Sequence, residues 1–191
     1  MKPIGVLSLQ GGYDPHLKML ARLGVEAYKV STLSEFDNIS GLIIPGGEST
    51  TIGKLLVQHN LLEPLRERIR SGLCVFGTCA GLILLAHQAE GSVQPLFDVL
   101  DVDVKRNAYG RQSSSFEAIV KLVGENLPPQ MAGIFIRAPQ IIRIGSEVKV
   151  LASYEDFPVA VQQGRIMAAS FHPELTQDTA LHEAFVKLAQ S

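Results

Sequence analysis

The chain has 191 residues, of which 46% are hydrophobic and 19% charged, and a formal net charge of −2. This composition predicts a globular protein with a single domain over residues 1–191. The small net charge gives no reason to expect nucleic acid or an anionic membrane as a partner.

Strand-like and helix-like segments alternate over the first part of the chain. Asp14-Pro15 opens the first helix, because Asp is a good N-cap and Pro suits the first helical position, and Gly24 ends it. Strands are predicted at 4–9, 25–30, 42–44 and 73–76, and further helices at 51–59 and 62–71. This order predicts a three-layer α/β fold, with a mostly parallel central sheet and helices on both faces.

The later part of the chain contains mainly short strand-like segments separated by turns. They lie at 101–105, 116–123, 134–137, 148–154, 159–162 and 166–171, and a last helix spans about 178–189. We therefore expect an antiparallel portion added to the parallel sheet. Parallel sheets bind ligands beyond the carboxyl ends of their strands. Pro45-Gly46-Gly47 and Cys79 both follow predicted strands, which places them at that edge.

Cys79 stands in the sequence Gly77-Thr78-Cys79-Ala80-Gly81, between an apolar strand and an apolar helix-like run that extends to Ala86. This is the layout of a nucleophile elbow, and a helix N-terminus there favours the thiolate form of a cysteine. Cys74, inside the preceding strand, is interpreted as a core residue. Two cysteines cannot form a disulfide framework, and a spacing of five residues is not typical of metal ligands.

The apolar stretch 4–9 near the N-terminus is too short for the core of a signal peptide, so none is expected. The longest apolar run, 73–86, falls short of the roughly 20 residues that cross a bilayer. We therefore expect no membrane association, a cytoplasmic location, and neither a metal nor a cofactor.

A cysteine nucleophile needs a base, and His172 is the strongest candidate. Pro173 favours an extended backbone at His172, and in an extended segment Glu174 points to the same side as His172. The carboxylate would then fix the imidazole tautomer, as in a catalytic triad. The alternative is a His-Pro-Glu turn at the surface.

The other four histidines fit a catalytic role less well. His59 and His182 lie in polar helical segments and are interpreted as surface residues. His87 is expected at the end of the helix that follows Cys79, where a cation is favourable. His16, in the first turn of a predicted helix, stays open.

Gly46-Gly47 follows a strand and can present backbone N–H groups to a developing oxyanion. The alternative is an ordinary turn in which Ser49 or Thr50 caps the next helix. The two interpretations are compatible.

Gly77–Gly81 and Ser170–Glu174 together resemble the triad-type (class I) glutamine amidotransferases. Other segments narrow the resemblance to the family of glutaminase subunits of pyridoxal 5'-phosphate synthase. These segments are Leu9–Gly11, Pro45–Thr51, Arg106–Gln112, Ser115–Glu117 and Phe135–Pro139. The resemblance covers nearly the whole chain and implies a flavodoxin-like fold.

The resemblance implies a role for each matching residue. Cys79 attacks the glutamine side-chain amide, His172 transfers the proton, and Glu174 orients His172. The backbone N–H groups of Gly47 and Ala80 form the oxyanion hole. Glutamine is bound by Gly47, Glu48, Ser49, Arg106, Ile136 and Arg137. The resemblance does not say which arginine contacts the substrate carboxylate.

The resemblance also implies a partner, a synthase subunit that receives the ammonia. In the complex, twelve synthase subunits are decorated by glutaminase subunits. One segment departs from the family pattern: Gly12-Tyr13-Asp14-Pro15 replaces a charged stretch ahead of His16. The docking contacts near this segment are therefore not predicted.

Two other functions remain open on the residues alone. One is a related cysteine-dependent hydrolase or peptidase on a similar α/β fold. The other is a non-catalytic binding subunit.

Overall fold

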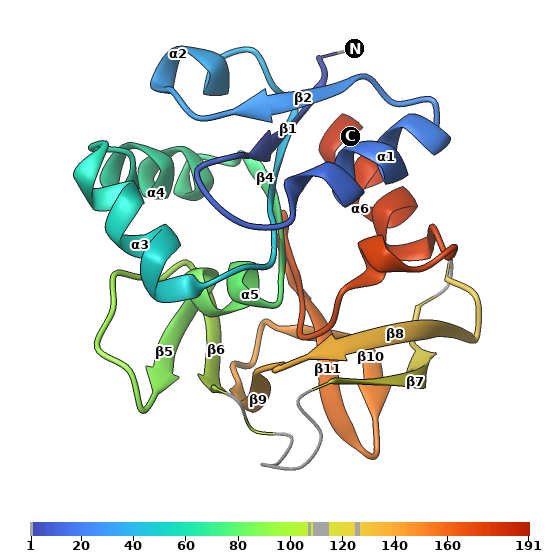
Figure 1. The fold of residues 1–191 in the computed structure, drawn as a ribbon. Coiled ribbons are helices and arrows are strands. Elements are labelled where there is room, and N and C mark those ends of the chain that lie inside the picture. Colours follow the sequence, from blue (N-terminus) through green and yellow to red (C-terminus); the bar gives the residue numbers. More distant parts are fainter. Residues whose placement is uncertain (1, 107, 109–114, 125–126) are drawn as a thin grey trace.

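A nine-stranded sheet forms the centre of the computed structural model, which describes residues 2–106, 108, 115–124 and 127–191 (Figure 1). Its strands are, in spatial order, β2 (Ala27–Val30), β1 (Ile4–Leu7), β3 (Gly41–Ile44), β4 (Cys74–Thr78), β12 (Ile166–Ala169), β11 (Phe157–Gln163), β10 (Lys149–Tyr154), β7 (Ser115–Leu122) and β8 (Gln130–Ile136). The five strands from β2 to β12 pair in parallel, and the ladders from β12 to β8 are antiparallel. The predicted antiparallel addition is confirmed.

Helices cover both faces of the parallel strands, so the predicted three-layer α/β class is confirmed (Figure 1). One face carries α1 (Tyr13–Arg22) and α6 (Ala180–Gln190), and the other carries α3 (Ser49–Gln58), α4 (Leu62–Arg70) and α5 (Ala80–Leu85). Within β4, Val75 packs into the core on the α3 side and Phe76 into the core on the α6 side. Strands buried on both faces have continuous apolar sequences, which is why the fully buried strands β1, β3, β4 and β12 could be predicted.

The run after Cys79 does not continue as a helix to His87, as the sequence had suggested. Helix α5 ends at Leu85, because Phe97 N–H donates to Leu84 O at 2.7 Å and Val99 N–H to Leu85 O at 3.1 Å. These bonds satisfy carbonyls that a longer helix would use itself. His87 instead lies exposed on a strand, with Nδ1 2.8 Å from Asp98 Oδ1.

That strand belongs to a second, three-stranded sheet that the sequence did not predict. It consists of β5 (Ala86–Glu90), β6 (Leu100–Lys105) and β9 (Gln140–Ile144), in that order. Two short helices were also missed, α2 (Leu33–Phe36) and the 3-10 helix η1 (Pro173–Leu175). No helix in the described ranges is long and apolar enough to cross a membrane.

Candidate active site

Cys79 occupies a sharp turn between β4 and α5. Its backbone has φ +49° and ψ −99°, a conformation outside the left-handed helical region that residues with a Cβ seldom adopt. The Cys79 N–H donates to Ala169 O at 2.8 Å, which ties the turn to the end of the neighbouring strand β12. A Cβ on Gly81 would overlap Ile44 O, so glycine is required for α5 to approach β3 this closely. The turn therefore has the strained geometry of a nucleophile elbow.

His172 and Glu174 lie beside this turn, just beyond β12. His172 Nδ1 is 2.7 Å from Glu174 Oε1, and the His172 N–H donates to Ile134 O at 2.8 Å. This contact was predicted, but the backbone conformation from which it was predicted is wrong. Pro173–Leu175 forms a 3-10 turn rather than an extended segment, because Pro fits the start of a helical turn. The turn brings the carboxylate back to the ring.

Burial and nearby charge act in opposite directions on this pair. Burial by itself lowers the pKa of His172, but the hydrogen bonds and negative charges of Cys79 and Glu174 outweigh burial and raise the pKa to about 10. Burial by itself raises the pKa of Glu174, but the charge and hydrogen bond of His16, together with those of His172, hold it well below its ordinary value. Glu174 is therefore ionised and His172 favours the imidazolium form at neutral pH.

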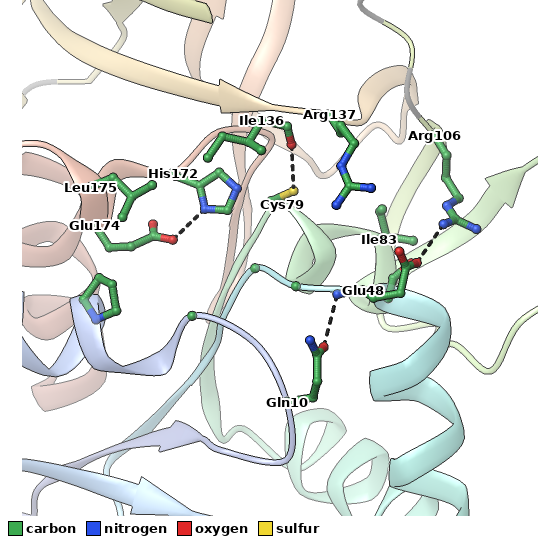
Figure 2. A pocket seen from close by; sticks show the side chains of 15 residues that line it. Gln10, Glu48, Cys79, Ile83, Arg106, Ile136, Arg137, His172, Glu174 and Leu175 are labelled. Atoms are coloured by element: carbon green, nitrogen blue, oxygen red, sulfur yellow. Dashed lines mark hydrogen bonds and ion pairs between the residues drawn. The ribbon is translucent and has the colours of Figure 1, made fainter. Parts of the chain in front are cut away.

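These groups open onto a cavity of about 370 Å³ (Figure 2). Its lining residues are Gln10, Gly12, Pro15, Gly46, Gly47, Glu48, Ser49, Cys79, Ile83, Arg106, Ile136, Arg137, His172, Glu174 and Leu175. All the predicted site residues except Ala80 are among them, and Ala80 is the buried residue that follows Cys79. Cys79 Sγ lies 3.8 Å from Ile136 O, and Figure 2 shows this contact next to His172.

The two arginines of the cavity have different surroundings. Arg106 Nη2 lies 3.0 Å from Glu48 Oε1, and Arg106 Nη1 donates to Ser92 Oγ at 3.1 Å. Within the described part of the chain, Arg137 makes no hydrogen bond or ion pair, and Figure 2 shows its guanidinium between Cys79 and Arg106. Residues 107 and 109–112 of the motif that begins at Arg106 lie outside the described residues.

Two buried histidines lie behind the carboxylate. His16 Nε2 is 3.4 Å from Glu174 Oε1, and His16 Nδ1 is 3.0 Å from His182 Nε2. The prediction that His182 is a surface residue is wrong, because α6 turns it inward beside Leu181 and against the ring of Phe76, at 5.6 Å between ring centroids. No sequence pattern distinguished His182, since the contact joins residues 166 positions apart. The position of His16 after β1, at the carboxyl edge of the sheet, was the available signal for its proximity.

The remaining predictions for cysteine and histidine agree with the structure. Cys74 is fully buried, and burial raises the pKa of its thiol to about 12, so it is an inert core residue. His59 is exposed.

The fold and the cysteine-centred cavity define a glutamine amidotransferase: residues 6–191 match the SNO glutamine amidotransferase family, and the chain belongs to that family. Among curated proteins, it is 50% identical over 184 residues to pyridoxal 5'-phosphate synthase subunit PdxT of Carboxydothermus hydrogenoformans, covering 96% of each chain. It is also 50% identical over 188 residues to the PdxT subunit of Thermus thermophilus, covering 97% of each.

Two solved structures show the same architecture. A crystal structure of a glutamine amidotransferase superposes with a TM-score of 0.93 at 47% identity, covering 98% of this chain and 99% of the other. The structure of PurLQS from Thermotoga maritima superposes with a TM-score of 0.69 at 15% identity, covering 98% of this chain and 99% of the other. The second likeness concerns the fold alone.

Proposed function

We propose that this protein hydrolyses L-glutamine to L-glutamate and ammonia, and that it supplies the ammonia to a pyridoxal 5'-phosphate synthase subunit. The observation that carries the proposal is a strained cysteine elbow in one cavity with a His172 ring held by Glu174. The partner is proposed from the relatives that are named as subunits of that synthase and that match over nearly the whole chain.

The reaction begins with attack of the Cys79 thiolate on the side-chain carbonyl carbon of glutamine. A carbon–sulfur bond forms, and an electron pair moves onto the carbonyl oxygen. The His172 imidazolium gives a proton to the amide nitrogen, the carbon–nitrogen bond breaks, and ammonia leaves. The pKa of about 10 keeps this proton on His172 through neutral pH, so the acid is ready when the nitrogen needs it.

The glutamyl thioester is then hydrolysed. His172, now neutral, takes a proton from water, and the hydroxide attacks the thioester carbon. The carbon–sulfur bond breaks, glutamate leaves, and the thiolate and imidazolium are restored. The hydrogen bond from Nδ1 to Glu174 leaves Nε2 of His172 to carry the mobile proton, and the ionised carboxylate stabilises the imidazolium.

The developing oxyanion is stabilised by the backbone N–H groups of Gly47 and Ala80. Ala80 is the first residue of α5, so its N–H has no partner within the helix. Gly46 O accepts a hydrogen bond from the Gly12 N–H at 2.9 Å. In a trans peptide the N–H points opposite to the carbonyl, so the Gly47 N–H is directed away from Gly12 and is available to the substrate.

The guanidinium of Arg137, which makes no ion pair with the described residues, binds the α-carboxylate of glutamine. Arg106 is engaged by Glu48 and Ser92, whereas no carboxylate in the described part of the chain pairs with Arg137, and guanidinium–carboxylate pairs are strong. Arg106 holds Glu48 in place through their ion pair. The Glu48 carboxylate in turn binds the α-ammonium group of the substrate. Ser49 and Ile136 complete the walls of the cavity.

The location and assembly are part of the same proposal. The reaction takes place in the cytoplasm, where both cysteines, which are free, stay reduced. The complex contains twelve synthase subunits decorated by glutaminase subunits, and native mass determination of the reconstituted complex tests that number.

The test is reconstitution with the synthase subunit, with pyridoxal 5'-phosphate formation driven either by glutamine or by an ammonium salt. Cys79→Ala is expected to abolish the glutamine-driven rate and to keep the ammonium-driven rate. The matched control, Cys74→Ala, is expected to keep both, and a glutamine-mimicking electrophile should label Cys79 only. Glutamine-driven formation that survives in Cys79→Ala would sink the proposal, and peptide turnover without glutamine turnover would favour a peptidase.

A further inference from the structure

Two completely buried histidines, His16 and His182, lie behind the proposed triad and take no part in the mechanism described above. Buried polar side chains are expected to have hydrogen-bond partners, and the partners here form a chain. His172 Nδ1 lies 2.7 Å from Glu174 Oε1, His16 Nε2 lies 3.4 Å from the same oxygen, and His16 Nδ1 lies 3.0 Å from His182 Nε2. A single carboxylate oxygen is therefore shared by two imidazoles.

Four elements contribute to this arrangement. His16 comes from the first turns of α1, His182 from α6, Glu174 from η1, and Thr78 from the end of β4, next to the nucleophile. Thr78 Oγ1 is 3.2 Å from His16 Nε2. The ring of Phe76, which belongs to the apolar core, packs against His182 and covers this group of side chains on the core side. Both ring nitrogens of His16 thus have a polar contact, and together these contacts fix the position of the ring.

The protons in this chain can be assigned from charge and burial. Burial, aided by the charge of His16, lowers the pKa of His182 to about 3, so His182 is neutral at neutral pH. Glu174 is ionised and can only accept hydrogen bonds. A lone pair on His16 Nε2 would face that negative charge, so Nε2 carries a hydrogen. One hydrogen lies between His16 Nδ1 and His182 Nε2, so that one of these nitrogens donates and the other accepts.

We propose that His16 is a positioning residue for glutamine hydrolysis, which donates from Nε2 to Glu174 Oε1 and fixes the carboxylate that orients His172. This proposal rests on the proposed function of the triad. His16 does not line the cavity, so it acts through Glu174 and His172 rather than on the substrate. Sharing the oxygen between two donors holds the carboxylate in one rotamer and divides its charge between both rings.

A pair of substitutions separates the donor role from packing. The side-chain nitrogen of Gln reaches about as far as Nε2 of His, and that of Asn only as far as Nδ1. His16→Gln therefore keeps a donor to Glu174, whereas His16→Asn keeps only the contact with His182. In the complex with the synthase subunit, we expect His16→Asn to lower the glutaminase kcat about tenfold, the lower end of the loss seen when the orienting partner of a metal-ligating histidine is removed. KM should stay unchanged, and His16→Gln should restore most of kcat.

His59→Asn, at an exposed position, is the control for the His-to-Asn change. Equal losses in His16→Asn and His16→Gln, or a rise in KM that matches the fall in kcat, would overturn the positioning role.

A second measurement needs no variant and no activity. The ¹⁵N NMR spectrum of the imidazoles in the wild-type chain is expected to show a protonated Nε2 on His16, and a bare Nε2 would overturn the proposal. If the wild-type complex released no ammonia from glutamine, the proposed function would fail, while the NMR result would still decide the hydrogen bond of His16.

Discussion

The ring of His172 lies directly against the backbone of Gly46. A Cβ added to Gly46 would overlap Cε1 of the imidazole and lie 3.0 Å from Nδ1. The glycine that follows β3 thus leaves the space that the ring occupies beside Cys79. The β3 loop and the segment after β12, which are far apart in sequence, are fitted to each other at this contact.

Gly46→Ala is therefore expected to displace His172 and to lower the glutaminase kcat of the complex by about 10²-fold, the cost of a misplacement of about 1 Å. The control is Gly12→Ala, because Gly12 lines the same cavity but an added Cβ there meets no atom within 4 Å. Both variants are assayed at saturating synthase subunit, and their thermal unfolding is compared. A Gly46→Ala protein with the kcat of the wild type would show that the ring has room to move.

Removal of each of the two arginines of the cavity is expected to affect KM differently for glutamine and for a glutamine analogue. Arg137→Ala should raise KM for glutamine about ten- to hundredfold, because a charge-assisted hydrogen bond contributes about 1.5–3 kcal/mol. It should not change KM for 4-aminobutanamide, which is glutamine without the α-carboxylate. Arg106→Ala loosens Glu48 and should raise KM for both compounds alike. The assignment of Arg137 to the carboxylate is wrong if Arg137→Ala raises KM equally for both compounds.

The burial of His182 predicts a loss of stability in acid. Its pKa is about 3 in the folded protein and about 6.5 when exposed, so below pH 6.5 the unfolded state binds a proton that the folded state excludes. Between pH 6.5 and 3, His182 therefore lowers the free energy of unfolding by about 1.4 kcal/mol for each unit by which the pH falls. His182→Gln cannot titrate and should have a shallower slope. Urea unfolding of both proteins between pH 4 and 7 measures the difference, and identical slopes would contradict the prediction.

The sequence predicted the parts of the fold whose signals are local. The strand before Cys79 is a continuous apolar run, and the glycines around the elbow indicate a tight turn. Pro173 and Glu174 stand beside His172 in the chain, so their pairing was visible even though a 3-10 turn, and not an extended segment, produces it. Helix α2 also had a local signal that was not used, since Glu35 accepts hydrogen bonds from the Ser31 and Thr32 N–H groups.

The missed features depend on contacts between distant segments. Helix α5 ends at Leu85 because residues 97 and 99 donate to its last carbonyls, which the apolar run itself does not indicate. The polar neighbours of His182 in the sequence suggested an exposed helix face, whereas its surroundings in space are Phe76 and His16. The pairing of Glu48 with Arg106 rather than with Arg137 is likewise a contact that no motif encodes.

The parallel register of β4 and β12 pairs Thr78 with Ala169, and the proposed nucleophile and base each follow within three residues of that pair. The spacing between them is therefore set by a strand ladder rather than by the long stretch of chain that separates residues 79 and 172. Insertions or deletions in that stretch leave the ladder unchanged wherever they fall in turns. A protein built in this way can vary the turns between its outer strands, and with them the surface offered to other molecules, while the nucleophile and the base keep their spacing.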